Sequence, residues 1–252
     1  MIRLACLILA ATAATAQETR RVTPEEAFHE AAVHYEASRF SEAAELYGQT
    51  AEFVPDSASA HYNLGNALLR RGTPGSLGLA IASYSRAFQL SPRDPDIRHN
   101  LSFALKRAGE ELIPAGTPPV FWKAYRLLSI TELKALFFLS LWGALLLATL
   151  WTVRVEWRER LRSPLTISLT LWLAAAGWWG SRTATGLRNP AVVVLAGAEV
   201  RSGPGTAFPV GFKVPEGRRV SRLGGNKNQW VEIGVPKEGL KGWIESDALE
   251  PI

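Results

Sequence analysis

The chain has 252 residues, room for one or two domains, and its 28 Lys and Arg against 23 Asp and Glu give a net charge of +5. Four of the arginines lie together in segment 154–162, and no basic run is interleaved with aromatic residues, so the composition disfavours a nucleic-acid groove. The single cysteine, Cys6, leaves no basis for a disulfide framework or a thiolate metal site.

The first residues have the pattern of an exported protein. One basic residue, Arg3, precedes the apolar stretch 4–14, and residues 14–16 (Ala-Thr-Ala) have the small side chains of a signal-peptidase site. We therefore predict a signal peptide over 1–16. An uncleaved N-terminal anchor is the alternative, whereas a lipoprotein anchor at Cys6 is disfavoured because the apolar stretch before it is too short.

Residues 17–113 are predicted to form an α-helical domain whose helices come in pairs. Pro24 suits the first turn of a helix, and Ser41 suits the N-cap of the next one. The predicted helices are Pro24–Ser38 paired with Ser41–Val54, Ala58–Arg71 paired with Leu77–Leu90, and Pro95–Ala108 alone.

These pairs form an internal repeat that resembles the tetratricopeptide repeat, a unit of about 34 residues with small and large apolar residues at fixed offsets. The segment 61–72 (HYNLGNALLRRG) is close to the first-helix consensus. Glu30 and Thr50 depart from the pattern, and the turn at 72–76 is longer than usual. We count two full repeats and a closing helix. The matching residues are Ala31, Phe40, Ala43, Tyr47, Pro55, Leu64, Gly65, Leu68, Ala80, Tyr84, Ala87, Pro92, Ile97, Asn100, Leu101 and Leu105.

Most of these motif positions are expected to form the core, because small residues let paired helices approach and large ones fill the space between pairs. The candidate binding residues are instead those on the groove-facing side of the first helices. Asn, Arg and Lys there suit an extended peptide or a carboxylate, and the alternative is a solvated helix face without a ligand. The candidates are Tyr35, Tyr62, Asn66, Leu69, Arg70, His99, Phe103 and Lys106.

Residues 114–132 are predicted to be a linker, because proline and glycine break the helical pattern from 114 to 119. The segment 120–133 (VFWKAYRLLSITEL) then sets Phe121, Trp122, Tyr125 and Leu128 at helical spacing. We expect a short helix lying in the membrane interface. An early start of the next helix is the alternative.

Two apolar segments follow, 133–153 and 163–181, and each includes 19 consecutive residues without a charge. At about 1.5 Å per residue each would be roughly 28 Å long, close to the thickness of a bilayer core. The loop 154–162 holds four arginines and two glutamates, so the positive-inside rule places it in the cytoplasm. The sequence therefore predicts a two-span hairpin in the inner membrane with both soluble parts in the periplasm. A buried helical hairpin in a soluble core is the alternative.

Residues 190–252 change to short apolar segments separated by Gly and Pro turns, which predicts a small all-β barrel. This region resembles the bacterial SH3 family, whose domains bind peptides or cell-wall material. The segments that carry the resemblance are 200–205 (VRSGPG), 215–217 (PEG), 229–233 (QWVEI) and 242–244 (GWI). Trp230 and Trp243 are candidates for an aromatic ligand platform. The alternative is that both simply fill the core of a small barrel.

No motif for catalysis or cofactor binding is found: the chain lacks a phosphate-binding glycine loop, a His-Glu-x-x-His motif and a Gly-x-Ser-x-Gly motif. Its four histidines all lie in the repeat helices, and His29 and His34 do not converge on one helix face. We therefore expect a protein that is not an enzyme, with no cofactor and no metal.

The whole chain is thus expected to be a multidomain membrane protein: a tetratricopeptide domain, a two-helix transmembrane hairpin and a small SH3-like barrel. This order resembles the BatE-like proteins of the Bat aerotolerance group. That resemblance implies a non-enzymatic scaffold of the bacterial envelope whose partners are membrane-anchored von Willebrand factor A-domain proteins. A peptidoglycan-binding sensor acting through the SH3-like domain is the alternative.

Overall fold

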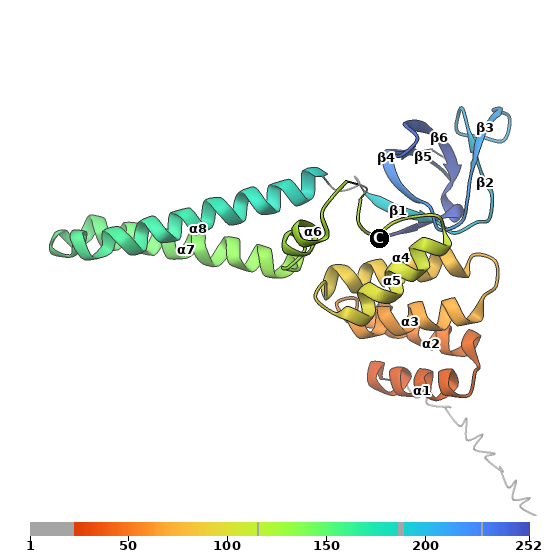
Figure 1. Cartoon of the computed structure of the whole chain (residues 1–252), viewed down its shortest axis with the longest axis horizontal. Coiled ribbons are helices and arrows are strands. Elements are labelled where there is room, and N and C mark those ends of the chain that lie inside the picture. The colour runs from red at the N-terminus through yellow and green to blue at the C-terminus, as the bar shows by residue number, and fades with distance from the viewer. Residues whose placement is uncertain (1–22, 115, 186–188, 228) are drawn as a thin grey trace, which may run out of the picture.

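The computed structural model describes residues 23–114, 116–185, 189–227 and 229–252, so the predicted signal peptide lies outside the described residues. Three parts are distinguishable in Figure 1: a stack of helices α1 to α5, a long hairpin of α7 and α8, and a C-terminal antiparallel sheet. The sheet lies against the α4 end of the stack, whereas α1 lies at the opposite end.

The stack consists of five helices close to those expected from the sequence. They are α1 (Pro24–Glu36), α2 (Phe40–Phe53), α3 (Ala58–Arg71), α4 (Ser76–Leu90) and α5 (Pro95–Arg107). Thr23 caps α1 in a capping box with Glu26, and Asp94 caps α5. The predicted cap Ser41 is wrong, because α2 begins one residue earlier and its N-cap, Arg39, makes no side-chain hydrogen bond.

Small side chains let the helices of the stack approach one another. Ala31, Ala43, Ala67 and Ala80 are fully buried, and Tyr84 fills the space beside them with no exposed surface. A Cβ atom on Gly65 would lie 2.6 Å from Cε1 of the Tyr84 ring, so the ring occupies the space that a larger residue would need. Ile97, Leu101 and Leu105 attach α5 to the same core.

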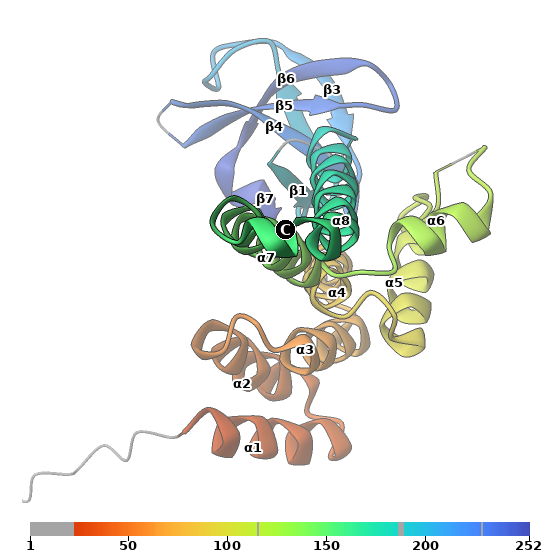
Figure 2. The same ribbon diagram turned by 90° about the vertical axis from the view of Figure 1, so that its left-hand side faces the viewer.

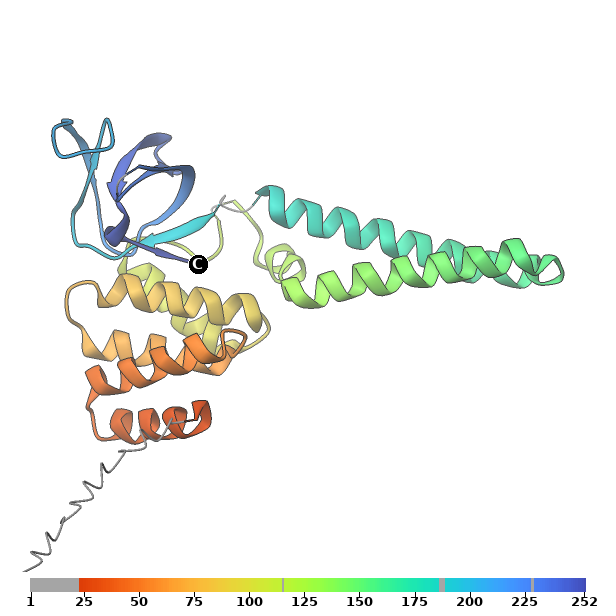
Figure 3. The ribbon, with the colours of Figure 1, turned by 180° about the vertical axis from the view of Figure 1, so that it is seen from behind.

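Two helices form a hairpin that extends away from the rest of the molecule (Figures 1 and 3). After the short helix α6 (Pro119–Tyr125), α7 (Ile130–Val153) leads through the 3-10 turn Val155–Trp157 into α8 (Arg158–Thr185). Ser140, Ala144 and Ala175 are buried between the long helices, and the Ser168 hydroxyl donates to the Ser140 carbonyl at 2.9 Å. Small residues at the contact thus let the two helices approach closely.

Within the described residues, α7 alone is long and apolar enough to cross a membrane. Its most apolar 18-residue window has a mean hydropathy of 2.0 and is 11% buried, so α7 is not a core helix of the molecule. The second predicted span, 163–181, lies within α8 but is not confirmed, because α8 does not meet the same criterion.

The C-terminal part is a seven-stranded antiparallel sheet, as far as the structure describes it, with strand order β3-β2-β6-β5-β4-β1-β7. Side chains such as Val200, Ile233 and Ile244 form its own core. The strands are β1 (Pro190–Val193), β2 (Ala198–Arg201), β3 (Val210–Val214), β4 (Arg219–Lys227), β5 (Trp230–Val235), β6 (Leu240–Glu245) and β7 (Leu249–Pro251), with the 3-10 turn Ser246–Ala248 before β7.

The sheet is docked on the repeat helices through β1 and β7. Val192 belongs to the core of the helical stack, and Ile252 packs against it. A Cβ on Gly78 of α4 would lie 2.5 Å from the carbonyl oxygen of Val193, and the Gly78 N–H donates to Glu216 at 3.0 Å. The backbones of α4 and β1 therefore approach closely, and the two folded parts form one continuous body (Figure 2).

Candidate binding surfaces

The groove-facing side of the repeat is organised by a polar network that joins three helices. The Tyr84 hydroxyl donates to Oδ1 of Asn66 at 2.7 Å, and the Asn100 amide donates to the same oxygen at 2.9 Å and to the Tyr62 hydroxyl at 3.0 Å. Burial, followed by the charges of Tyr62 and Tyr35, raises the pKa of Tyr84. Tyr84 therefore stays protonated as the donor, and Asn66 holds α3, α4 and α5 together.

Asn100 belongs to this network although the sequence assigned it only to the repeat pattern. It lies 34 residues after Asn66, which is the period of the repeat, so the two amides occupy equivalent places on α3 and α5, the first helices of successive repeats. That spacing is the signal from which the pairing could have been inferred.

Other predicted groove residues remain accessible. The guanidinium of Arg70 lies 4.8 Å from the ring centroid of Phe40, and Phe103 on α5 is half exposed. The Tyr35 ring packs edge-on against Phe40 at 5.4 Å, and Leu69 is partly buried against the core. Arg70 and Phe103 are therefore the predicted residues best placed to contact a partner without forming part of the core.

The structure separates two of the predicted groove residues from the others. His99 and Lys106 line a hollow of about 710 Å³ between α5 and the segment 111–123, together with Ser102. This hollow lies on the side of α5 that faces away from its buried residues, where a complete third repeat would have its second helix.

Trp122 partly fills the place of that missing helix. It is buried, and its ring stacks on Phe88 of α4 with the centroids 5.6 Å apart. Its neighbour Phe121 is 71% exposed, so α6 directs one aromatic residue into the stack and another outward. The hydrophobic contact of Trp122 fixes α6 to the end of the repeat domain.

The two tryptophans proposed as a platform in the sheet differ in environment. Trp230 is buried and borders a small pocket of about 140 Å³ together with Glu199 and Arg201. Trp243 is only partly buried and pairs with Glu232 across β5 and β6. No contact between the two rings is found in the described part of the chain.

The loop 201–209 is held in shape by Arg201. One guanidinium nitrogen donates to the carbonyl oxygens of Thr206 and Phe208 at 3.1 and 2.8 Å, and the other pairs with Glu199 at 2.7 Å. The Phe208 ring covers Gly203, where a Cβ would lie 2.5 Å from the ring. This organised loop lies beside the pocket that Trp230 borders, so together they form the best-defined candidate ligand surface of the sheet.

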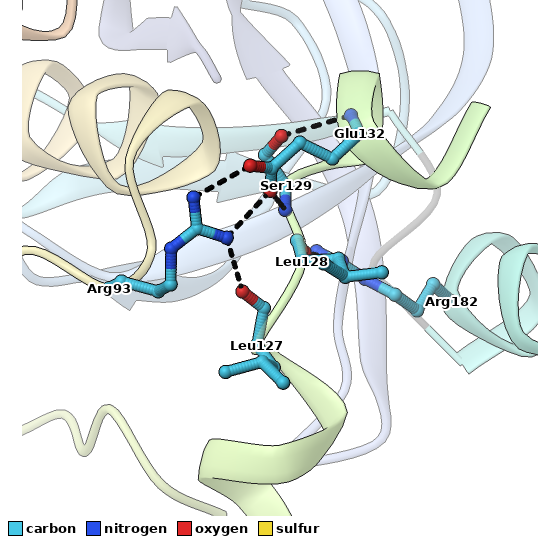
Figure 4. A network of polar contacts seen from close by, with 6 residues as sticks. All are labelled: Arg93, Leu127, Leu128, Ser129, Glu132 and Arg182. Carbon is cyan, nitrogen blue, oxygen red and sulfur yellow. Dashed lines mark hydrogen bonds and ion pairs between the residues drawn. The ribbon is translucent and has the colours of Figure 1, made fainter. Parts of the chain in front are cut away.

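The base of the hairpin is tied to the repeat by an ion pair (Figure 4). Both terminal nitrogens of Arg93 donate to the Glu132 carboxylate, at 2.8 and 2.6 Å, and one also donates to the Leu127 carbonyl at 3.0 Å. Glu132 in turn completes the capping box of α7 with Ser129. The first turn of α7 is therefore linked directly to the loop that precedes α5.

No group of three His, Cys, Asp or Glu side chains suited to a metal ion occurs within the residues that the structure describes. A buried histidine, His61, instead has a structural role, because its Nε2 donates to the Pro55 carbonyl at 2.9 Å. Burial lowers the pKa of His61, Arg86 lowers it further, and the Pro55 hydrogen bond opposes both.

Comparison with known proteins identifies two domain types in the chain. Residues 31–72 match the TPR repeat, and residues 196–250 match the bacterial SH3 domain. A stretch of 53 residues in the SH3-like region is 34% identical to "Probable cell wall amidase LytH" of Staphylococcus aureus, including its COL and MW2 strains. That stretch covers 21% of this chain and 18% of LytH, so the chain spans about a fifth of the length of this relative.

Proposed function

We propose that this chain is a non-enzymatic scaffold, anchored in the inner membrane by a two-span hairpin, that presents a repeat groove and an SH3-like domain to partners in the bacterial envelope. The observation that carries the proposal is the exposed apolar hairpin between two modules of interaction type. On α7, Leu139 is 72% and Leu146 61% exposed, and on α8 Leu173 is 62% exposed. Such a surface is stable in lipid and is a liability in water.

The loop end of the hairpin supports insertion. At the loop end, the guanidinium of Arg158 lies 4.8 Å from the Trp151 ring centroid, and that of Arg154 lies 5.7 Å from Trp157. Tryptophan and arginine together are typical of a membrane–water interface, and a basic loop favours the cytoplasmic side. The repeat domain and the sheet then both lie in the periplasm.

Partner binding is assigned to the repeat groove, and the resemblance to BatE-like proteins suggests membrane-anchored von Willebrand factor A-domain proteins as the partners. The test is co-purification from detergent with the double variant Arg70→Ala, Phe103→Ala. Both side chains are exposed, so the fold should persist while recovery of partners falls. An Asn66 variant is less informative, because it would leave the buried Tyr84 hydroxyl without its acceptor. If the double variant recovers as much partner protein as the wild type, the groove is not the partner-binding site.

Peptidoglycan binding by the SH3-like domain is the second candidate, and the similarity to a region of a cell wall amidase favours it. The full chain should be used, because Val192 and Ile252 pack on the repeat core. We expect the detergent-solubilised protein to sediment with purified sacculi at low salt, and Arg201→Gln, which releases the 201–209 loop, to reduce the bound fraction. If the wild type stays in the supernatant, the cell-wall role fails.

A further inference from the structure

Three arginines from distant parts of the chain line one cavity at the base of the hairpin. Arg126 follows α6, Arg182 lies in the last turns of α8, and Arg219 begins β4. All three border a cavity of about 270 Å³ whose other walls include Phe88 and Trp122. The repeat, the hairpin and the sheet thus each contribute to this cavity.

These arginines have few protein partners. Arg182 is 8% exposed, and the one hydrogen bond of its side chain within the described residues goes to the Leu128 carbonyl at 2.5 Å (Figure 4). The side chain of Arg126 makes no hydrogen bond or ion pair with any described residue, and its Nε is buried without a partner. The Nε of Arg219 is likewise buried and unpartnered, although a terminal nitrogen of its guanidinium donates to the Glu111 carbonyl oxygen at 2.7 Å. A buried guanidinium without an acceptor is costly, so these side chains favour an anion as their ligand.

The nearby carboxylate does not balance this charge. Glu110 accepts a hydrogen bond from Arg219 at 3.3 Å, but it also pairs with Arg218 at 3.2 Å and Lys237 at 3.3 Å. Burial lowers the pKa of Arg126, and the charges of Arg182 and Arg219 lower it further, while Tyr125 acts in the opposite direction. The cavity therefore carries an excess of positive charge.

A second hollow continues from this cavity between α6 and α8. It has a volume of about 880 Å³, shares Arg126 and Arg182 with the cavity, and is otherwise lined by residues such as Phe121, Tyr125 and Trp178. The indole N–H of Trp178 donates to the Tyr125 carbonyl at 3.1 Å, which fixes one side of the hollow. One end of the combined space is cationic and the rest is largely apolar, which matches an amphiphile with an anionic head.

We propose that this space binds an anionic phospholipid, with its phosphate held by Arg126 and Arg182, Arg219 adding positive charge beside it, and an acyl chain along the hollow between α6 and α8. The inference rests on the proposed insertion of the hairpin, which puts this region at the membrane interface. Arginine is suited to phosphate because its planar fork can donate two parallel hydrogen bonds. The bound lipid would fix the hairpin to the folded body.

The test uses the full chain purified in an uncharged detergent. Phosphatidylglycerol, phosphatidylcholine and inorganic phosphate are added separately, bound lipid is counted by native mass spectrometry, and the unfolding midpoint is recorded. We expect phosphatidylglycerol to stay bound and to raise the midpoint more than phosphatidylcholine does. Inorganic phosphate at the same concentration should have little effect, and an equal effect of free phosphate would overturn the lipid as the ligand.

The variants make the test specific. Arg126→Gln should weaken phosphatidylglycerol binding by about tenfold or more. Because this substitution removes an unpaired buried charge, it should also raise the unfolding midpoint in lipid-free detergent. The variant should therefore have the higher midpoint without lipid, and the wild type should have the higher midpoint with phosphatidylglycerol. Arg182→Gln should lose the lipid as well. Arg160→Gln, which removes an exposed arginine at the far end of the hairpin, is the control and should bind like the wild type.

Equal lipid affinity of Arg126→Gln and the wild type would contradict the proposal. This failure is distinguishable from failure of the proposed function. If the hairpin is not inserted, the wild type will be recovered from cells without detergent. If only the lipid site is wrong, the wild type will remain in the membrane fraction and the two Gln variants will behave like Arg160→Gln.

Discussion

At the scale of single residues, Gly65 shows how the repeat pattern translates into packing. Its backbone faces the fully buried Tyr84 ring, and that ring is held by the hydrogen bond to Asn66. The repeat consensus requires a small residue here and a large one opposite, and the sequence was sufficient to predict both. The further role of Asn66 as a structural acceptor was not predicted, because a polar residue on a helix face looks the same whether it binds a ligand or a neighbouring helix.

Replacing Gly65 with Ala should therefore destabilise the repeat. The new Cβ would lie 2.6 Å from the Tyr84 ring, and overpacking of this kind costs about 1–3 kcal/mol. Gly48→Ala in α2 is the matched control, since beyond the nearby backbone of α2 itself no atom lies within 4 Å of its Cβ position, and alanine favours a helix by about 1 kcal/mol. Thermal melts followed by circular dichroism should show a lower midpoint for Gly65→Ala than for Gly48→Ala. Equal midpoints would mean that the Tyr84 ring can move aside.

His61 predicts a pH dependence of stability. The folded chain lowers the pKa of His61 below the ordinary value of 6.5, so the unfolded state binds the proton first as the pH falls. The contribution of His61 to stability is therefore fully present above pH 6.5 and is lost as the pH falls from there through the lower folded pKa. The physical reason is burial, which disfavours the charged imidazolium, and Nδ1 has no acceptor among the described residues. Urea unfolding from pH 7.5 to 5 should show a smaller loss for His61→Gln than for the wild type, and His99→Gln, at an exposed site, should follow the wild type.

At the scale of elements, the helices were predicted more closely than the strands. Prolines, capping residues and a regular repeat mark the ends of α1 to α5, whereas β2, β3 and β7 have only three to five residues each. The longer β4 runs through Gly224, Gly225 and Asn226, which have the composition of a turn. The direction of Trp122 was also not predictable: helical spacing placed it among interfacial aromatics, but its partner Phe88 lies in another helix.

The groove candidates His99 and Lys106 were separated from Asn66 for a similar reason, because only the packed position of α5 decides which of its faces is covered.

The contact between α4 and β1 provides a prediction at this scale. Gly78→Ala places a Cβ 2.5 Å from the Val193 carbonyl oxygen and 2.9 Å from Cα of Val194, so the sheet must move away from the helix. Hydrogen exchange should then accelerate at the Gly217 amide, which is bonded to the Val193 carbonyl at 2.8 Å, and at Gly78 itself. The Gly48→Ala chain is again the reference. Unchanged exchange at both amides would show that the two parts are not rigidly coupled.

At the scale of the whole molecule, the hairpin is attached to a body in which repeat and sheet are already joined. Contacts such as Gly78 to Glu216, 138 residues apart, could not be foreseen from local sequence patterns. The Arg93–Glu132 pair adds a link from the repeat to the first turn of α7. Both soluble parts must therefore lie on the same side of the proposed membrane, as a two-span topology requires.

The most direct test of this account is the accessibility of single cysteines in intact cells. Cys6 is the chain's only cysteine, so Cys6→Ser allows one cysteine to be introduced at Lys106, Arg160 or Lys241, which are all exposed. In spheroplasts, a membrane-impermeant maleimide should label Lys106→Cys and Lys241→Cys, and Arg160→Cys should react only after permeabilisation. Labelling of Arg160→Cys together with the other two in intact spheroplasts, or of none of the three before permeabilisation, would contradict the inserted hairpin with periplasmic modules.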